Sequence, residues 1–349
     1  MLSLGEDSNI AVAPVGVGAL SVGHYHSLAF RAEHDYLVLV FGPVKKYQRA
    51  VIERQGKNRN VFIYAGHSPF DLSSYVKSNF PPRTYRAWND FSAFDQSQGV
   101  ETTLFEVKKM ERVSIPAPLI EEHLRIKTRL TCQFGPLTSM RFTGEPGTYD
   151  DNTDYNIAIT NLRYFIADTP CLFSGDDSAM ARQLPERDTW KANSDYFSNL
   201  RFKAESGPYA TFCGYYIGSE GAVRCPKPLI TKLMLALDED SLDEKLASYV
   251  TEFSVGHSLG DEMWNLLPID QVPYQSAAFD FICRHAPREL KVALNIGSVP
   301  ADVLSTWTGT ITRPLFALLS KAQRLAYLQS FPSRFASWAH SFLPSREGL

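Results

Sequence analysis

CLFSGDDSAM, residues 171–180, predicts two short buried strands joined by a tight acidic turn. A turn of this kind is common, so by itself it indicates a β-hairpin and nothing more specific. Two further stretches change that interpretation, AWNDFSAFDQSQ at residues 87–98 and MRFTGEPGTYDDNT at residues 140–153. Together they supply carboxylates, glycines, hydroxyls and amides in a fixed order. This combination indicates a site built from three separate elements.

The acidic residues of these stretches suit nucleotidyl transfer. Asp90 is expected at the end of a strand over residues 84–90, and Asp176 and Asp177 lie in the hairpin turn. Two Mg²⁺ ions need hard carboxylate oxygens from separate rigid elements. Selection of a ribose needs hydroxyl and amide groups nearby, and the middle stretch supplies them. Taken singly, each motif is also compatible with an ordinary solvated turn.

The bulk composition is that of a globular protein. The chain has 349 residues, of which 44% are hydrophobic, and its formal net charge of −3 argues against indiscriminate nucleic-acid binding through a basic coat. Its five cysteines are scattered without a CxxC pair, so neither a zinc site nor a redox site is indicated. Because no uninterrupted apolar run of about 18 residues occurs, we expect no transmembrane segment.

Local patterns predict the remaining elements. Residues 28–41 end in a β-branched apolar run, which predicts a buried strand leading into a basic helix. A short strand is expected at residues 60–66, a small antiparallel sheet from Leu200 onward, and a helical region after Pro228. Further helices are expected at residues 67–82, 99–112, 120–130 and 316–331, and from Asn152 onward.

The three stretches together resemble the RNA-dependent RNA polymerases of positive-strand RNA viruses, in particular the tymovirus-like and flexivirus-like replicases (Tymovirales) of the alphavirus-like group. NDFSAFDQSQ resembles motif A of these enzymes, TGEPGTYDDNT motif B and FSGDDS motif C. FKAE, which contains Lys203, resembles motif D, and FCG at residues 212–214 resembles motif E. GPVKKYQR and MERVSIP are also similar to that group, so the resemblance runs from about residue 41 to about residue 295.

The resemblance implies an α+β fold with a right-hand polymerase palm, which is an antiparallel sheet backed by helices, a helical thumb and truncated fingers. Residues 1–81 would form partial fingers, residues 82–228 the palm with motifs A to E, and residues 229–349 the thumb. A fingers insertion is expected near residues 113–139. Shortened fingers are expected because VGVGALSVGHYHSLAF stands where the family carries basic residues.

The resemblance also implies a role for each candidate site residue. Asp90, Asp176 and Asp177 would bind two Mg²⁺ or Mn²⁺ ions, Asp177 as an auxiliary ligand. Lys203 would be the general acid that protonates the leaving pyrophosphate. The ribonucleotide would be bound by Asp95, Thr143, Gly144, Thr148, Asn152 and Ser174. Among these, the carboxylate and the amide would recognise the 2′-hydroxyl that only a ribonucleotide carries.

Flexible and basic residues complete the expected site. Gly144 and Gly147 would give the loop before the helix the freedom to adopt unusual dihedral angles. Phe212 and Cys213 either support the primer strand or pack in the core of a small sheet. A basic group either lines the path of the triphosphate or template, or forms a solvated helix face; it consists of Lys45, Lys46, Arg49 and Arg54.

The implied function is template-directed RNA synthesis in viral RNA replication. The expected partners are template and primer RNA, ribonucleoside triphosphates, and the helicase and capping domains of a replicase. The expected location is the host cytoplasm, in a membrane-associated replication complex reached through those partners.

Two alternatives stay open. A reverse transcriptase or another palm polymerase would share the acidic strands, but Asp95 with Asn152 argues against a deoxynucleotide enzyme, which normally has a bulky steric gate there. A catalytically silent replicase fragment or virus-derived RNA-binding remnant is favoured by the missing upstream basic residues. The intact site argues the other way, because a silent remnant has no chemical need for Asp90, Asp176, Asp177 and Asn152.

Overall fold

A computed structural model describes residues 28–54, 60–129, 131–132, 135–136, 139, 141 and 145–296. The chain divides into two compact units. The first comprises residues 1–66 and 79–213, and the second comprises residues 67–78 and 214–349. Every predicted site residue that the structure describes falls in the first unit.

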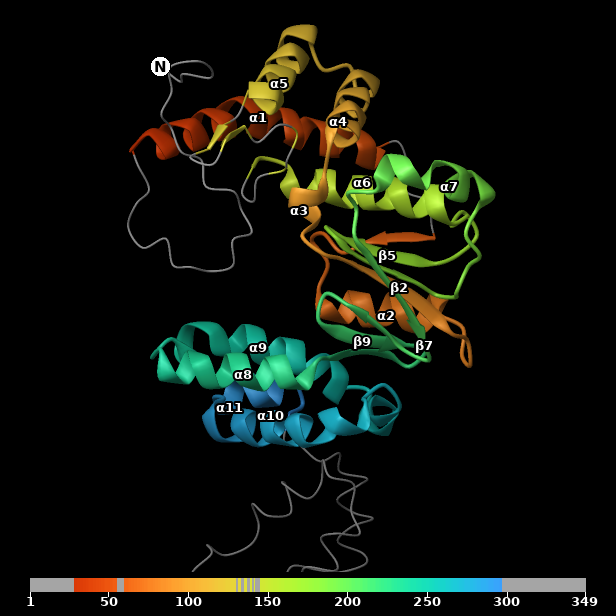
Figure 1. Ribbon diagram of the computed structural model, residues 1–349. Coiled ribbons are helices and arrows are strands. Elements are labelled where there is room, and N and C mark those ends of the chain that lie inside the picture. Colours follow the sequence, from red (N-terminus) through yellow and green to blue (C-terminus); the bar gives the residue numbers. More distant parts are fainter. Residues whose placement is uncertain are drawn as a thin grey trace, which may run out of the picture. The chain divides into compact units, whose positions relative to one another are not determined.

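A five-stranded sheet forms the centre of the first unit (Figure 1). Its strands lie in the order β1, β5, β6, β2, β7. Their bounds are β1 Val61–Ile63, β5 Cys171–Ser174, β6 Asp177–Met180, β2 Arg86–Phe91 and β7 Phe202–Gly207. The pairing of β1 with β5 is parallel, and the other three pairings are antiparallel. This mainly antiparallel sheet and its helices make the fold α+β, as the resemblance implied.

Helix α6, Thr148–Arg163, lies along this sheet (Figure 1). Its Tyr155 and Ile159 are one turn apart and pack in a buried cluster with Phe91 of β2. These positions recur at helical spacing, so one stripe of the helix faces the sheet. The other elements of this unit are α3 Phe94–Ser97, α4 Val100–Arg112, α5 Ala117–Arg129, β3 Thr131–Cys132, β4 Gly135–Pro136, α7 Asp188–Asn193, η1 Ser194–Phe197 and β8 Ala210–Phe212.

The prediction of a strand at residues 28–41 is wrong, because this segment is the first half of helix α1, Leu28–Arg54. Tyr36, Val40 and Val44 recur every four residues, and such spacing gives a helix one apolar stripe. That stripe packs against α4, α5 and the turn between them. The cluster contains Phe41, Val44, Met110, Val113, Ile115 and Ile126. Burial of a helical stripe thus outweighs the local strand preference of the valines.

Most of the other local predictions are confirmed. The strands expected at residues 60–66 and 84–90, the acidic hairpin, and the helices at residues 99–112 and 120–130 all form. The long helix begins at Thr148, four residues before the expected start. The antiparallel sheet expected from Leu200 onward forms in part, since residues 215–218 pair with residues 221–224. The first strand of that region differs from the expectation, because β7 joins the five-stranded sheet as the neighbour of β2.

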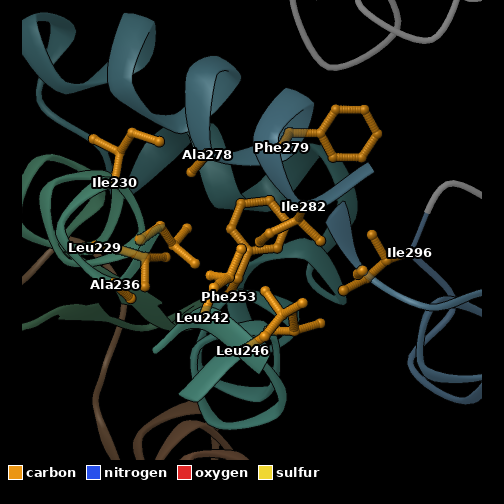
Figure 2. Close-up of a cluster of buried hydrophobic side chains, with 13 residues drawn as sticks. Leu229, Ile230, Ala236, Leu242, Leu246, Phe253, Ala278, Phe279, Ile282 and Ile296 are labelled. Carbon is orange, nitrogen blue, oxygen red and sulfur yellow. The ribbon is translucent and has the colours of Figure 1, made fainter. Parts of the chain in front are cut away.

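The second unit is mostly helical. Its cluster of buried side chains comes mainly from α8 (Pro226–Asp238), α9 (Leu242–His257) and α10 (Val272–His285), with Phe253 and Ile282 near its centre (Figure 2). The helical region expected after Pro228 is therefore confirmed as far as residue 296, whereas the helix expected at residues 316–331 lies outside the described residues. The elements are α2 Pro69–Asn79, β9 Tyr215–Gly218, β10 Gly221–Arg224, α8 Pro226–Asp238, α9 Leu242–His257, η2 Gly260–Asn265, η3 Ile269–Gln271, α10 Val272–His285 and α11 Arg288–Ala293.

Among the residues that the structure describes, no helix has the length and apolar character needed to span a membrane.

Candidate active site

The sheet presents Asp90 on an exposed position of β2. Its neighbours Asn89 and Phe91 are buried, and the alternation of a strand directs Asp90 to the opposite face. In the antiparallel pairing of β2 with β7, Asp90 lies opposite Lys203. Lys203 Nζ approaches Asp90 Oδ2 to 3.6 Å, with both side chains more than half exposed. The sheet order therefore brings together two predicted site residues that are distant in sequence.

The β5–β6 hairpin supplies the second group of carboxylates. Gly175 adopts a φ of 59°, a backbone conformation that residues other than glycine rarely adopt, and this permits the tight turn. Ser174 pairs with Asp177 across the turn, and Asp176 lies between them and is exposed. This hairpin is adjacent to β2 in the sheet because β6 pairs with β2.

The carboxylates of the hairpin and of the 87–98 stretch influence one another. Crowding by protein atoms raises the pKa of Asp176, and the negative charges of Asp95 and Asp90 raise it further. Burial likewise raises the pKa of Asp177, with further contributions from Asp176 and Asp90. Four acidic side chains thus gather in one region, where their mutual repulsion favours a bound cation.

The donor set fits Mg²⁺ or Mn²⁺ bound together with a substrate. Within the described part of the chain, no group of three or more acidic, histidine or cysteine side chains is close enough to hold a metal ion by itself. Mg²⁺ usually keeps waters and binds through one or two carboxylates plus substrate phosphates, without a complete protein cage. Asp90 on β2 and Asp176 in the turn supply such carboxylates from two rigid elements.

Helix α6 holds the acidic turn through a side chain that the sequence analysis missed. The fully buried Asn156 Nδ2 donates to the backbone carbonyls of Gly175 at 3.1 Å, Asp176 at 2.9 Å and Asp177 at 3.3 Å. Thr153 Oγ1 accepts a hydrogen bond from the Gly175 N–H at 2.9 Å. The sequence did contain a signal for this role. Asn156 lies one turn after Asn152 in the interior of a helix, where asparagine is unfavourable unless its side chain has a specific partner.

The predicted ribose-binding pair also meets in the structure. Asn152 Nδ2 donates to Asp95 Oδ1 at 2.7 Å, which links α6 to the first turn of α3. Thr148 begins α6, and its hydroxyl donates to the Glu145 carbonyl at 2.7 Å. Gly147 has the positive φ expected of it, 82°, and precedes the helix as its N-cap. The structure therefore places a carboxylate and an amide side by side at the edge of the acidic site.

The remaining predicted residues have different outcomes. Ser174 ends β5, and its hydroxyl lies 3.1 Å from that of Tyr149 on α6. Thr143 and Gly144 lie outside the described residues. Phe212 is buried and packs edge-on with Tyr64, which favours the core-packing interpretation for this residue. Burial raises the pKa of the Cys213 thiol to about 12, so the thiol is neutral beside the acidic turn.

A buried ionic cluster lies behind α6, and the sequence analysis missed it. At its centre, Asp151 Oδ2 contacts Lys45 Nζ at 2.6 Å and Asp151 Oδ1 contacts Lys109 Nζ at 2.9 Å. Arg141 forms ion pairs with Glu106 and, at 3.5 Å, with Asp151. All five side chains are at most one tenth exposed. This ionic cluster consists of Lys45, Glu106, Lys109, Arg141 and Asp151.

The ionic cluster corrects part of the hypothesis about the basic group. Lys45 is buried against Asp151, so it neither lines a path for triphosphate or template nor belongs to a solvated helix face. Arg49 is exposed and pairs with Asp150 on α6. Lys46 and Arg54 are exposed on α1. Lys45 and Arg49 therefore attach α1 to α6.

Comparison with known proteins identifies a matching family and several relatives. A family model described as RNA dependent RNA polymerase matches residues 35–276. The non-structural replication polyprotein of Grapevine fleck virus is 49% identical over 90% of this chain, and that of Erysimum latent virus is 47% identical over 83%. The polyprotein of Turnip yellow mosaic virus is 44% identical over 86% of the chain. The chain spans only 16–17% of the length of these three relatives.

Among solved structures, the RNA-dependent RNA polymerase of a human picorbirnavirus aligns with 77% of this chain and 52% of its own, at 12% identity and a TM-score of 0.45. That structural likeness is too low to carry a conclusion. The family model covers more than half of the chain, and relatives with over 40% identity cover more than four fifths of it. The chain therefore belongs to the RNA dependent RNA polymerase family.

Proposed function

We propose that this chain is the catalytic core of a viral RNA-directed RNA polymerase, which transfers ribonucleotides to a primer strand under the direction of an RNA template. The observation that carries this proposal is the proximity of two groups of side chains, one on the five-stranded sheet and one on the helices beside it. Asp90 and the acidic turn of Asp176 and Asp177 form one group, and the hydrogen-bonded Asp95–Asn152 pair forms the other. Such a site combines metal-binding carboxylates with a means of recognising ribose.

In the proposed mechanism, Asp90 and Asp176 would hold two Mg²⁺ or Mn²⁺ ions, with Asp177 as an auxiliary ligand. Such ions would supply activation of the primer 3′-hydroxyl and neutralisation of charge on the triphosphate and leaving pyrophosphate. The Asp95–Asn152 pair orients the incoming ribose by its 2′-hydroxyl, while Thr143, Gly144, Thr148 and Ser174 complete the nucleotide site.

Lys203 is proposed as the general acid for the leaving pyrophosphate. Its ammonium group faces Asp90 at 3.6 Å and is 60% exposed, so its long side chain is free to reorient toward a phosphate. Binding of a metal by Asp90 would compete with this ion pair and release the ammonium group. The antiparallel pairing of β2 with β7 places this proton donor on the strand next to that of Asp90.

We also propose a functional division of the chain and its wider setting. Residues 1–81 belong to the fingers, residues 82–228 to the palm with a fingers insertion near residues 113–139, and residues 229–349 to the thumb. The relatives are replication polyproteins of which this chain matches about one sixth. Helicase and capping domains are therefore the proposed partners, in a replication complex of the host cytoplasm that reaches membranes through those partners.

The proposal is tested by elongation of a primed RNA template by the 349-residue chain with Mg²⁺ or Mn²⁺. We expect one labelled ribonucleotide to be added when it complements the next template base, and no addition with EDTA or with a non-complementary nucleotide. A folded chain that binds the primed RNA but adds no nucleotide would support the alternative of a silent, RNA-binding replicase remnant.

Asn156→Ala tests the support of the acidic turn. The substitution removes a buried amide that contacts three successive carbonyls, and loss of such a group costs about 1–3 kcal/mol. We expect a roughly tenfold lower rate of incorporation and a higher half-saturating Mg²⁺ concentration, because Asp176 and Asp177 lose their fixed positions. Incorporation measured as a function of Mg²⁺ concentration checks both effects.

The matched control is Asn193→Ala on α7. Asn193 is exposed, and its amide donates to a single helix carbonyl, that of Thr189, at 2.8 Å. We expect the control to leave both the rate and the Mg²⁺ requirement unchanged. An Asn156→Ala variant with the Mg²⁺ requirement of the control would show that α6 does not position the turn.

A further inference from the structure

A file of hydrogen-bonded side chains, in which each side chain donates to the next, runs from the ionic cluster to the Asp95–Asn152 pair. Arg141 Nε donates to Gln98 Oε1 at 3.1 Å, and Gln98 Nε2 donates to Asn152 Oδ1 at 2.8 Å. Asn152 Nδ2 in turn donates to Asp95 Oδ1 at 2.7 Å. Arg141, Gln98 and Asn152 are 1%, 3% and 7% exposed, so the file is shielded from competing water. Gln98 is thus the link between the cluster and the pair.

The two ends of this file determine its direction. A guanidinium group donates hydrogen bonds and does not accept them, whereas an ionised carboxylate only accepts them. The amides of Gln98 and Asn152 each carry one acceptor and one donor group and fit either orientation on their own. With Arg141 at one end, Gln98 must turn its oxygen to the arginine and its nitrogen to Asn152. Asn152 must then turn its nitrogen toward Asp95.

Arg141 is itself held in place. Its guanidinium forms ion pairs with Glu106 and Asp151, and His123 Nε2 lies 2.7 Å from Glu106 Oε2. The backbone N–H of Arg141 also donates to the carbonyl of Asp95 at 3.2 Å. A buried arginine with two carboxylate partners keeps its charge and its planar geometry. The start of the file is therefore fixed by buried side chains and by the backbone of Asp95.

We propose that Gln98 and Arg141 are positioning residues for ribose selection, because they set the orientation of the Asn152 amide. They thereby determine which hydrogen-bonding atoms of the Asp95–Asn152 pair face a 2′-hydroxyl. The inference rests on the proposed function, in which that pair recognises the ribose. Discrimination by a polar site depends on fixed hydrogen-bond donors and acceptors, because a substrate without the hydroxyl leaves them unpaired. An Asn152 amide free to rotate would offer such donors and acceptors less consistently.

Gln98→Glu tests the file with almost no change in shape. The carboxylate still accepts from Arg141 but has no donor for Asn152 Oδ1, so the Asn152 amide is expected to rotate. We expect the preference for a ribonucleotide over its 2′-deoxy counterpart to fall about tenfold or more. Arg141→Lys, which keeps the charge but not the planar guanidinium, is expected to lower the preference in the same direction.

The matched control is Gln96→Glu, the same chemical change at an exposed position of α3. It adds the same negative charge two residues away, and we expect the ribose preference to stay at the wild-type value. Thermal unfolding verifies that each variant is folded. If Gln98→Glu does not fold, Gln98→Met removes both hydrogen bonds without adding charge and carries the same expectation.

Two measurements separate this inference from the proposed function. The ratio of incorporation efficiencies for ATP and 2′-deoxy-ATP is the first, and the ratio of their dissociation constants is the second. A wild-type chain that binds nucleotides but does not incorporate them contradicts the proposed function, and the binding ratio still tests the file. A folded Gln98 variant with the wild-type ratio, or a wild-type chain without ribose preference in either measurement, overturns the inference.

Discussion

Replacement of Asp176 by alanine is expected to slow ribonucleotide incorporation by about three orders of magnitude or more. A metal ion stabilises the developing charge of phosphoryl transfer by several kcal/mol, and each 1.4 kcal/mol corresponds to a factor of about ten in rate. Asp176 is the turn carboxylate whose pKa is raised by crowding and by Asp95 and Asp90, which places it among the proposed metal ligands. Single-nucleotide extension of a primed RNA template measures the loss.

The same substitution is expected to leave the fold intact. Because crowding by protein atoms and neighbouring carboxylates disfavours the charge of Asp176, its removal relieves repulsion, and the melting temperature should stay the same or rise. Asp188→Ala is the matched control, since this carboxylate is 99% exposed and pairs with Lys191 on the surface of α7. An Asp176→Ala variant that retained more than a tenth of the wild-type rate would rule out its role as a principal metal ligand.

The strands and turn of the acidic site could be predicted because their signals are local. The apolar and acidic letters around Gly175 specify a hairpin, and the strand expected over residues 84–90 places Asp90 near the end of β2. What the sequence did not indicate is that β7 lies next to β2 and pairs Lys203 with Asp90. Pairing between strands distant in the chain depends on the whole sheet, which no local pattern encodes.

The supports of the site were missed for a related reason. Lys45 reads as one of several basic residues on a surface helix, yet it is buried against Asp151, more than one hundred positions later in the chain. The strand expected at residues 28–41 failed for the same cause, because the apolar spacing of α1 acquires its meaning only from α4 and α5. Buried charges are recognisable once their partners are known, and these partners come from distant segments.

Asp151→Asn is expected to lower the free energy of unfolding by about 3–5 kcal/mol, the usual cost of breaking a buried ion pair. Asp151 is 1% exposed and contacts Lys45, Lys109 and Arg141, so its removal leaves buried cations with less compensating charge. Asp150→Asn is the matched control at the next residue. Asp150 is 27% exposed and pairs with Arg49, and its loss is expected to cost at most about 1 kcal/mol. Urea denaturation at neutral pH measures both values.

The pH dependence of stability provides an independent check on the same residue. Burial opposes ionisation of Asp151, but Lys45 and Lys109 hold its pKa below the ordinary value, and Lys127 and Arg141 do the same for the buried Glu106. A carboxyl whose pKa is lowered by folding stabilises the protein above its unfolded-state pKa, about 4, and this contribution is lost as the pH falls toward the folded-state pKa. Wild-type stability should therefore decline steeply below about pH 4.

In Asp151→Asn that decline should be shallower than in the wild type, because one carboxyl whose pKa is lowered by folding is gone. Urea denaturation repeated from pH 6 down to about pH 3 distinguishes the two. Equal acid sensitivity in wild type and Asp151→Asn would mean that Asp151 is not stabilised as a carboxylate. The ionic cluster would then contribute no net charge stabilisation to the helix that holds both the acidic turn and Asn152.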